Sequence, residues 1–220
     1  MNCLSQIENG IFADKRELKK LETQKESKIL VISDTHGAKE YLTLIIEQFG
    51  PAVDAVIFTG DGIYDLISVM EKGHKYRDAA KWLPPVIAFV RGNNDPSFAS
   101  ADFNETITVP SKVLLKAGNR NILVTHGHNE SVYYDISTLE QCAATYNANT
   151  VLYGHTHVPF EILTRKAYIM NPGSIGYPRN HSKPGFAILE ISEKAVYSIF
   201  YKIEFDSDIH FTPYHPEIFY

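Results

Sequence analysis

Three short apolar runs alternate with helical patterns in the first half of the chain, and this alternation limits its fold more than any other feature. The runs are rich in β-branched residues, as is typical of buried strands, and they cover residues 29–32, 53–58 and 86–90. An i, i+3, i+4, i+7 pattern predicts a helix between the first two runs, carried by Leu42, Ile45, Ile46 and Phe49. Further helical stretches from about residue 64 to 82 precede the third run. Strand, helix and strand in this order predict parallel strands joined by right-handed crossovers, the α/β class.

The second half of the chain has shorter strand patterns separated by turn signals such as Gly118-Asn119. One helix interrupts them, with an apolar face made by Val132, Ile136, Leu139, Ala143 and Tyr146. The predicted strands cover residues 106–109, 113–116, 121–125, 150–153, 160–163, 168–170, 186–191 and 196–203. Pro213 and Pro216 indicate that the last dozen residues form an irregular tail. We therefore expect two mixed sheets packed face to face with helices outside, a four-layer α/β/β/α sandwich.

Residues 1–27 stand apart from this pattern because charged side chains dominate them. Asp14 and Glu17 have the spacing of a helix-capping pair, and Leu18 and Leu21 add a thin apolar edge. We predict a charged N-terminal helical extension at 1–27, followed by a single domain at 28–220. A solvated or packed helix is favoured over a catalytic role, and a contact surface for a partner or second subunit is the alternative.

The composition excludes several classes of protein. The 220 residues carry 21 Lys plus Arg against 26 Asp plus Glu, and the net charge of −5 disfavours binding to long nucleic acid through its phosphates. The 2 cysteines are too few for a disulfide framework. The first residues lack the pattern of a signal peptide, and no apolar run approaches the ~18 residues that span a membrane. We expect a cytoplasmic protein that does not bind membranes.

Five polar strings each follow a predicted strand, so we expect all of them at one edge of a sheet, where ligands of α/β proteins bind. Together they supply carboxylates, imidazoles and an amide, which are oxygen and nitrogen ligands for divalent metals. The strings are Ser33-Asp34-Thr35-His36-Gly37, Gly60-Asp61-Gly62, Gly92-Asn93-Asn94-Asp95, Thr125-His126-Gly127-His128 and Gly154-His155-Thr156-His157. The ordered set points to a two-metal hydrolase acting on phosphate esters.

Taken singly, most of these strings are equally well explained as turns. Asp34 and His36 are two residues apart and can face one ion, but a lone Asp-x-His is more often a capped turn. Asp61 lies between glycines that let its carboxylate approach an ion closely, and a carboxylate has two oxygens with which to bridge two metals. Asn93 offers a neutral oxygen ligand, although Asn and Gly also favour turns.

The two His-x-His pairs are harder to explain as packing, because the chain has only 9 histidines and both pairs end predicted strands. The remaining histidines have no functional assignment: His74, His181, His210 and His215. The ligand types suit Mn, Fe, Ni or Zn without choosing among them. A single closed zinc site is disfavoured, because seven ligands exceed what one tetrahedral ion needs.

The ordered set resembles the calcineurin-like metallophosphoesterases, and within them the small YfcE-like phosphodiesterases. The likeness covers residues 28–203 and includes Asn171-Pro172-Gly173-Ser174 and Pro178-Arg179. It implies the metallophosphoesterase fold and two divalent metal ions, foremost Mn, with Ni, Zn, Fe or Mg as alternatives. By resemblance, one ion is held by Asp34, His36 and His157, and the other by Asn93, His126 and His155, with Asp61 bridging them.

The resemblance also implies roles around the metals. His128 is expected at the rim, in contact with the phosphate or orienting a ligand, and Asp95 is expected behind the metal ligands, where it fixes their geometry. Arg179 is expected either to pair with a phosphate oxygen or to form a structural salt bridge. Larger members of the superfamily have His where this chain has Asn94, and that His is thought to protonate the leaving group. Asn94 cannot act as a general acid near neutral pH, which weighs against a protein phosphatase.

Our hypothesis is a metal-dependent phosphodiesterase in which a metal-bridging hydroxide attacks the phosphorus of a small phosphodiester in line. Asp61 and Asn93 are the expected catalytic metal ligands, and His128 or a metal-bound water is expected to supply the leaving-group proton. The alternatives are a non-catalytic scaffold or interaction protein of the same fold, and a nuclease on short oligonucleotides. The sequence leaves homo-oligomer formation open.

Overall fold

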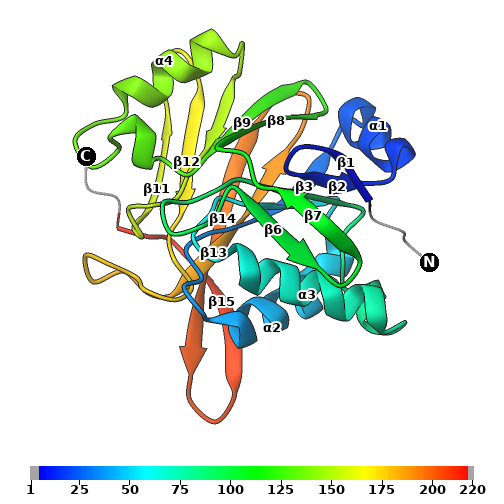
Figure 1. Ribbon diagram of the computed structural model, residues 1–220. Helices are drawn as coiled ribbons and strands as arrows, with labels where there is room; N and C mark the ends of the chain where they lie inside the picture. The colour runs from blue at the N-terminus through cyan, green and yellow to red at the C-terminus, as the bar shows by residue number, and fades with distance from the viewer. Residues whose placement is uncertain (1–4, 218–220) are drawn as a thin grey trace.

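The computed structural model describes residues 5–217 and contains a large mixed sheet (Figure 1). In spatial order β1-β2-β5-β4-β3-β13-β14-β15, its strands are Ser5–Glu8, Ile11–Ala13, Val86–Phe89, Ala55–Phe58, Ser27–Ile32, Gly185–Ile191, Val196–Phe205 and Ile209–Tyr214. As predicted, β3, β4 and β5 are parallel, with Ile29 opposite Ala55 and Ala55 opposite Val86.

A second, mixed sheet faces the first. In spatial order β11-β12-β10-β9-β8, its strands are Pro159–Leu163, Tyr168–Pro172, Thr150–Leu152, Arg120–Thr125 and Lys112–Ala117. A separate two-stranded sheet is formed by β6 (Phe98–Ala101) and β7 (Asn104–Thr108). The helices are α1 (Lys15–Thr23), α2 (Lys39–Phe49), α3 (Ile63–Lys75) and α4 (Ser137–Thr145). Within residues 5–217, none of the helices has the length and apolar character needed to cross a membrane.

The side chains of β3 show how the layers pack. Leu30 and Ile32 belong to the core under α2 and α3, whereas Ile29 and Val31 point into the core between the two sheets. This alternation follows from the period of two along a strand buried on both faces. On the other side of the second sheet, Leu123 packs in a third core with residues of α4. The predicted four-layer α/β/β/α sandwich is therefore confirmed.

The prediction that residues 1–27 are helical is correct only in part. Asp14 caps α1 by accepting a hydrogen bond from Arg16 N at 2.7 Å, as its spacing indicated. Residues 1–4 lie outside the described part of the chain, and β1 and β2 form a hairpin rather than a helix. The hairpin turns at Asn9-Gly10, where Gly10 has φ +77°, and β2 pairs with β5 to extend the large sheet. An Asn-Gly dipeptide directly before a short apolar run is a hairpin signal, which the polar residues of Ser5–Glu8 and the charges after Ala13 obscured.

Two other local predictions are wrong. Residues 209–214 form the edge strand β15 instead of an irregular tail, with Pro213 opposite Tyr201. An edge strand tolerates proline because one side of it needs no backbone donor. The predicted helix beginning near Val132 begins instead at Ser137, because residues 131–134 form turns, and Ser131 there has φ +54°.

Replacing Phe12 with alanine is expected to lower the free energy of unfolding by about 3–5 kcal/mol. Phe12 is fully buried, and its ring centroid lies 5.9 Å from that of Phe89 and 6.0 Å from that of Phe103. Urea denaturation measures the loss. The control is Phe98→Ala, since Phe98 is 63% exposed. Equal losses in the two variants would contradict the integration of the hairpin into the core.

Candidate metal centre

The five polar strings meet at one edge of the sandwich, where the parallel strands of both sheets end. Backbone hydrogen bonds join neighbouring loops: Asp34 N donates to Gly60 O at 2.9 Å, and His36 N donates to Asp61 O at 3.2 Å. The two sheets are linked across this edge by His155 N, which donates to Asp34 Oδ2 at 3.1 Å. The expectation that these loops converge is thus met by the fold.

Several predicted ligands have a left-handed backbone. The residues with positive φ include Asp34 (52°), His36 (44°), Asp61 (60°), His155 (67°) and His157 (61°). This conformation costs roughly 1–2 kcal/mol per L residue and persists only where the surroundings impose it. Such strained residues gather at functional sites, and here they turn side chains from separate loops toward one point.

A first group of potential ligands comprises Asp34, His36 and His157. His157 Nε2 lies 3.2 Å from both Asp34 Oδ1 and His36 Nε2, and His36 Nε2 lies 3.8 Å from Asp34 Oδ1. Asp34 and His157 are buried, and His36 is partly exposed. The three residues that the resemblance assigned to one metal ion therefore lie together.

A second group comprises Asp34, Asp61 and His126, all buried. His126 Nε2 lies 3.5 Å from Asp61 Oδ2 and 3.9 Å from Asp34 Oδ1. Asp61 Oδ2 also lies 3.7 Å from His36 Nε2, so this carboxylate lies between the two groups. Asp34 is shared by both groups, whereas the sequence argument gave a shared position to Asp61 alone.

These residues fit divalent metal ions. Among the described side chains, Asp34 Oδ1 and His126 Nε2 are buried and have no hydrogen-bond partner, although both are strong polar atoms. His126 Nδ1 lies 2.8 Å from Thr59 O and His157 Nδ1 lies 2.5 Å from Tyr177 O. Because a carbonyl only accepts, each Nδ1 carries a proton, and each Nε2 faces the cluster as the nitrogen available to a metal ion.

The other two histidines of the pairs flank His126. The ring centroid of His126 lies 5.0 Å from that of His155 and 5.4 Å from that of His128. Burial and then the charge of His126 lower the pKa of His155 to about 4, and the same causes lower the pKa of His128. For His126 burial opposes protonation, but Asp61 and Asp34 raise its pKa above the ordinary value. Neutral imidazoles at His155 and His128 can accept a metal or a proton.

The Gly92–Asp95 loop holds Asp61 in position. Asn94 donates to both oxygens of Asp61, from its backbone N to Oδ1 at 2.8 Å and from Nδ2 to Oδ2 at 2.6 Å. Burial alone would raise the pKa of Asp61, but His126 and Asn94 hold it well below its usual range. Asn93 is exposed on the same loop.

The carboxylate of Asp95 accepts hydrogen bonds from backbone N–H groups rather than from the side chains of the predicted metal ligands. Its Oδ2 accepts from the backbone N of Asp61 (2.7 Å) and of Gly92 (3.0 Å), and its Oδ1 accepts from Gly62 N and Ile63 N, both at 2.9 Å. A carboxylate at the start of α3 also satisfies free N–H groups of the helix. Asp95 therefore joins the Gly60–Gly62 loop to the Gly92–Asp95 loop, next to the backbone of Asp61.

The sequence argument missed two residues of this edge. Asp65, in the first turn of α3, accepts from Thr35 Oγ1 at 2.5 Å and from Gly37 N at 2.8 Å. Tyr133 donates from its hydroxyl to His155 O at 2.9 Å. An acidic residue in a first helical turn is a recognisable signal, but nothing in the sequence pattern around Tyr133 marks that residue.

Arg179 lies at the rim and is exposed. Its Nη1 donates to the hydroxyl of Tyr133, and its backbone N donates to His157 O at 3.2 Å. The guanidinium is thus held by a tyrosine hydroxyl, an arrangement that the sequence argument did not consider.

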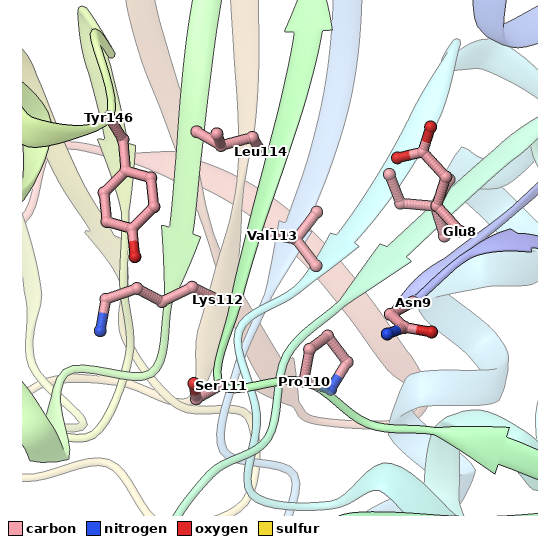
Figure 2. Close-up of a pocket in the computed structure, with 9 residues that line it drawn as sticks. Glu8, Asn9, Pro110, Ser111, Lys112, Val113, Leu114 and Tyr146 are labelled. Atoms are coloured by element: carbon pink, nitrogen blue, oxygen red, sulfur yellow. The ribbon is translucent and has the colours of Figure 1, made fainter.

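A groove of about 710 Å³ lies beside this edge, between the β1–β2 turn and β8. Figure 2 shows Glu8 and Asn9 on one side of it and Lys112 and Tyr146 on the other. Lys112 Nζ is paired with the buried Glu130, at 2.5 Å from its Oε1. Within residues 5–217, the lining of this groove shares no residue with the predicted ligands.

Comparison with known proteins places this geometry in a family context. A family model described as the calcineurin-like phosphoesterase superfamily domain matches residues 28–194. The chain is 34% identical over 173 residues to a probable metallophosphoesterase, YsnB, of Bacillus subtilis. This match covers 79% of this chain and 89% of YsnB. It is 25% identical over 169 residues to the phosphodiesterase YfcE of Escherichia coli, and this match covers 74% of this chain and 87% of YfcE.

Solved structures agree. A predicted phosphoesterase from Streptococcus pneumoniae has a TM-score of 0.63 at 25% identity and covers 87% of this chain and 100% of its own. Vacuolar Protein Sorting 29 from Cryptosporidium parvum has a TM-score of 0.64 at 16% identity and covers 87% and 99%. At that identity the second likeness concerns the fold alone.

Proposed function

Because the chain belongs to the calcineurin-like phosphoesterase superfamily, we propose that it is a metal-dependent phosphodiesterase acting on small phosphodiesters. The observation that carries the proposal is the pair of ligand groups that share Asp34 and have Asp61 between them. Two adjacent groups of this kind suit two ions better than one. The net charge of −5 favours a small substrate over a long nucleic acid.

We assign Asp34, His36 and His157, which lie together, to one ion. On the family resemblance we assign Asn93, His126 and His155 to the other ion, with Asp61, which lies beside His126, reaching both. Mn is the first metal to test, and Ni, Zn, Fe and Mg are the alternatives. Divalent ions at such a site activate water as a nucleophile and neutralise charge on the phosphate oxygens. The strained backbone and the carbonyls behind His126 and His157 keep the imidazoles oriented for this role.

His128 is proposed to contact the phosphate at the rim. It is partly exposed, and its Nδ1 is among the buried atoms without a hydrogen-bond partner in residues 5–217. A neutral imidazole beside the cluster can donate a hydrogen bond from one nitrogen to a phosphate oxygen or to the departing oxygen, without transferring that proton near neutral pH. Asp61, Asn93 and His128 are the catalytic residues of this proposal.

Hydrolysis is expected to slow steeply as the leaving group becomes poorer. Asn94 has no proton to give near neutral pH, and its amide already donates to Asp61 Oδ2. A missing general acid costs roughly 10²-fold or more when the leaving group needs protonation. The measurement is kcat for methyl aryl phosphates whose phenols range from p-nitrophenol to phenol. Asn94→His is the matched variant and should flatten the dependence, whereas a flat dependence in the unchanged protein would count against the assignment.

The proposal itself is tested with bis-p-nitrophenyl phosphate and metal-stripped protein, to which Mn, Ni, Zn or Mg is added back. Turnover that depends on the metal supports a metal-dependent phosphodiesterase. Folded protein that gives no turnover with any metal would overturn it and favour a scaffold or interaction protein. That alternative draws support only from fold likeness to Vacuolar Protein Sorting 29, while the buried ligand groups favour an enzyme. A cytoplasmic location stays a prediction.

A further inference from the structure

A second hollow, of about 580 Å³, adjoins the histidine cluster on the outer side of the second sheet. Apolar and aromatic side chains dominate its lining, including Val132, Tyr133, Tyr134, Ile136, Val158 and Ile162. Among the lining residues, Thr156 lies between His155 and His157 in the chain, and Tyr133 and Arg179 donate hydrogen bonds to the backbone carbonyls of these two histidines. The pocket is therefore continuous with the candidate metal centre.

Tyr133 is the wall between the pocket and the histidines. Its ring centroid lies 4.9 Å from that of His155, and its hydroxyl donates to His155 O at 2.9 Å. On the other side, Arg179 donates to the same hydroxyl, with its Cζ 6.0 Å from the centre of the tyrosine ring. Arg179 N also donates to His157 O. Tyr133 is therefore held directly to the backbone of His155 and, through Arg179, to the backbone of His157.

The exposure of the aromatic residues distinguishes the floor of the pocket from its mouth. Tyr153 is 3% exposed and forms the floor, whereas Tyr133 is 53% and Tyr134 90% exposed. A tyrosine that is almost fully exposed at the mouth of an apolar pocket offers a free ring face on which a planar group can stack. Arg179 at the same mouth can also lie over an aromatic group or near an anionic one.

The ring of His155 is a neighbour of both His128 and Tyr133, and Tyr133 in turn lines the pocket. The centroids of His128 and His155 are 6.1 Å apart, and those of His155 and Tyr133 are 4.9 Å apart. If the departing oxygen of a phosphate at the histidines faces His128, the ester group that remains can extend along His155 and over Tyr133 into the pocket.

We propose that this pocket is a subsite for the non-leaving ester group of the substrate and that it selects an aromatic, planar group. The inference rests on the proposed phosphodiesterase function, which it deepens by naming the class of substrate. A nucleoside or aryl phosphodiester meets this requirement, and a simple alkyl diester does not. Tyr134 is then a specificity residue that contacts the substrate away from the reacting atoms.

The test keeps the leaving group constant and changes only the other arm. Methyl p-nitrophenyl phosphate and phenyl p-nitrophenyl phosphate both release p-nitrophenol, so the ratio of their kcat/KM values reports the second ester group. Comparing this ratio between protein variants cancels the intrinsic reactivity of the two esters. Tyr134→Ala is expected to lower the phenyl-to-methyl ratio by roughly fivefold to tenfold, the size of a lost aromatic contact. Tyr76→Ala, at a 56% exposed tyrosine that ends α3, is the control and should leave the ratio unchanged.

A binding measurement separates this inference from the proposed function. Calorimetry of the metal-loaded protein with phenyl phosphate and methyl phosphate should give tighter binding of the phenyl ester by a similar factor, lost in Tyr134→Ala. If both diesters are hydrolysed with the same ratio in all three proteins, the subsite is overturned and the phosphodiesterase stands. If neither diester is hydrolysed, the phosphodiesterase is overturned, and the calorimetric preference alone decides whether the subsite exists.

Discussion

Asp61→Asn is expected to lower metal-dependent diester hydrolysis by at least roughly 10³-fold, because preorganised charge is the largest contribution at sites of this kind. Asp61 Oδ2 lies 3.5 Å from His126 Nε2 and 3.7 Å from His36 Nε2, so this oxygen, like Asp34 Oδ1, reaches both sides of the cluster. Asparagine keeps the shape of the side chain and removes its charge. It also replaces one acceptor by a donor, which opposes the two hydrogen bonds given by Asn94.

The measurement is kcat/KM with bis-p-nitrophenyl phosphate at saturating Mn, together with a calorimetric titration of the metal. The titration should show weaker binding or fewer ions per chain, which separates loss of metal from loss of chemistry. Asp78→Asn is the matched control, since Asp78 lies on the surface and is paired with Lys81 at 2.9 Å. An exposed pair of this kind contributes little, so this variant should behave as the unchanged protein. Undiminished turnover in Asp61→Asn would rule out the proposed role of Asp61.

The sequence predicted those parts of the fold that depend on local periodicity. Ile29 to Ile32 read as a strand buried on both faces, and the structure puts alternate side chains of that strand into two different cores. The β1–β2 hairpin and β15 were not predicted because their strands are short and depend on pairing with other strands of the large sheet, β2 with β5 and β15 with β14. Tertiary pairing decides the state of such segments, and local propensity is weak there.

Of the candidate site, too, the sequence predicted one part and not another. The order of the motifs and their positions after strands were enough to bring Asp34, Asp61 and His126 together, because parallel strands end at a common edge. The contacts of Asp65 with Thr35 and Gly37 join segments about thirty residues apart, and no spacing rule encodes them. The left-handed backbone of the predicted ligands could not be predicted from the sequence either, because asparagine and glycine favour that conformation more strongly than histidine does.

Gly92→Ala is expected to reduce metal-dependent turnover by roughly 10²-fold, as a displacement of about 1 Å at a catalytic group can do. A Cβ at position 92 would lie 2.0 Å from Asp61 Oδ1 and 2.5 Å from Asp61 N, distances that real atoms do not adopt. Either the Asp61 carboxylate or the loop beneath it must move, and Asp95 holds both backbones through Asp61 N and Gly92 N. The added methyl group therefore acts on the position of Asp61 and leaves its charge unchanged.

Gly118→Ala provides the control for this steric argument. Gly118 has φ +56° in the turn between β8 and β9, so alanine there should cost roughly 1–2 kcal/mol of stability without touching the metal centre. Thermal unfolding and kcat/KM are measured for both variants. We expect Gly118→Ala to lose stability and keep its turnover, and Gly92→Ala to lose turnover well beyond what its change in stability explains. If the two variants lose turnover only in proportion to stability, close packing against Asp61 does not set the activity, and the Asp61 carboxylate adapts more easily than the 2.0 Å distance to an added Cβ implies.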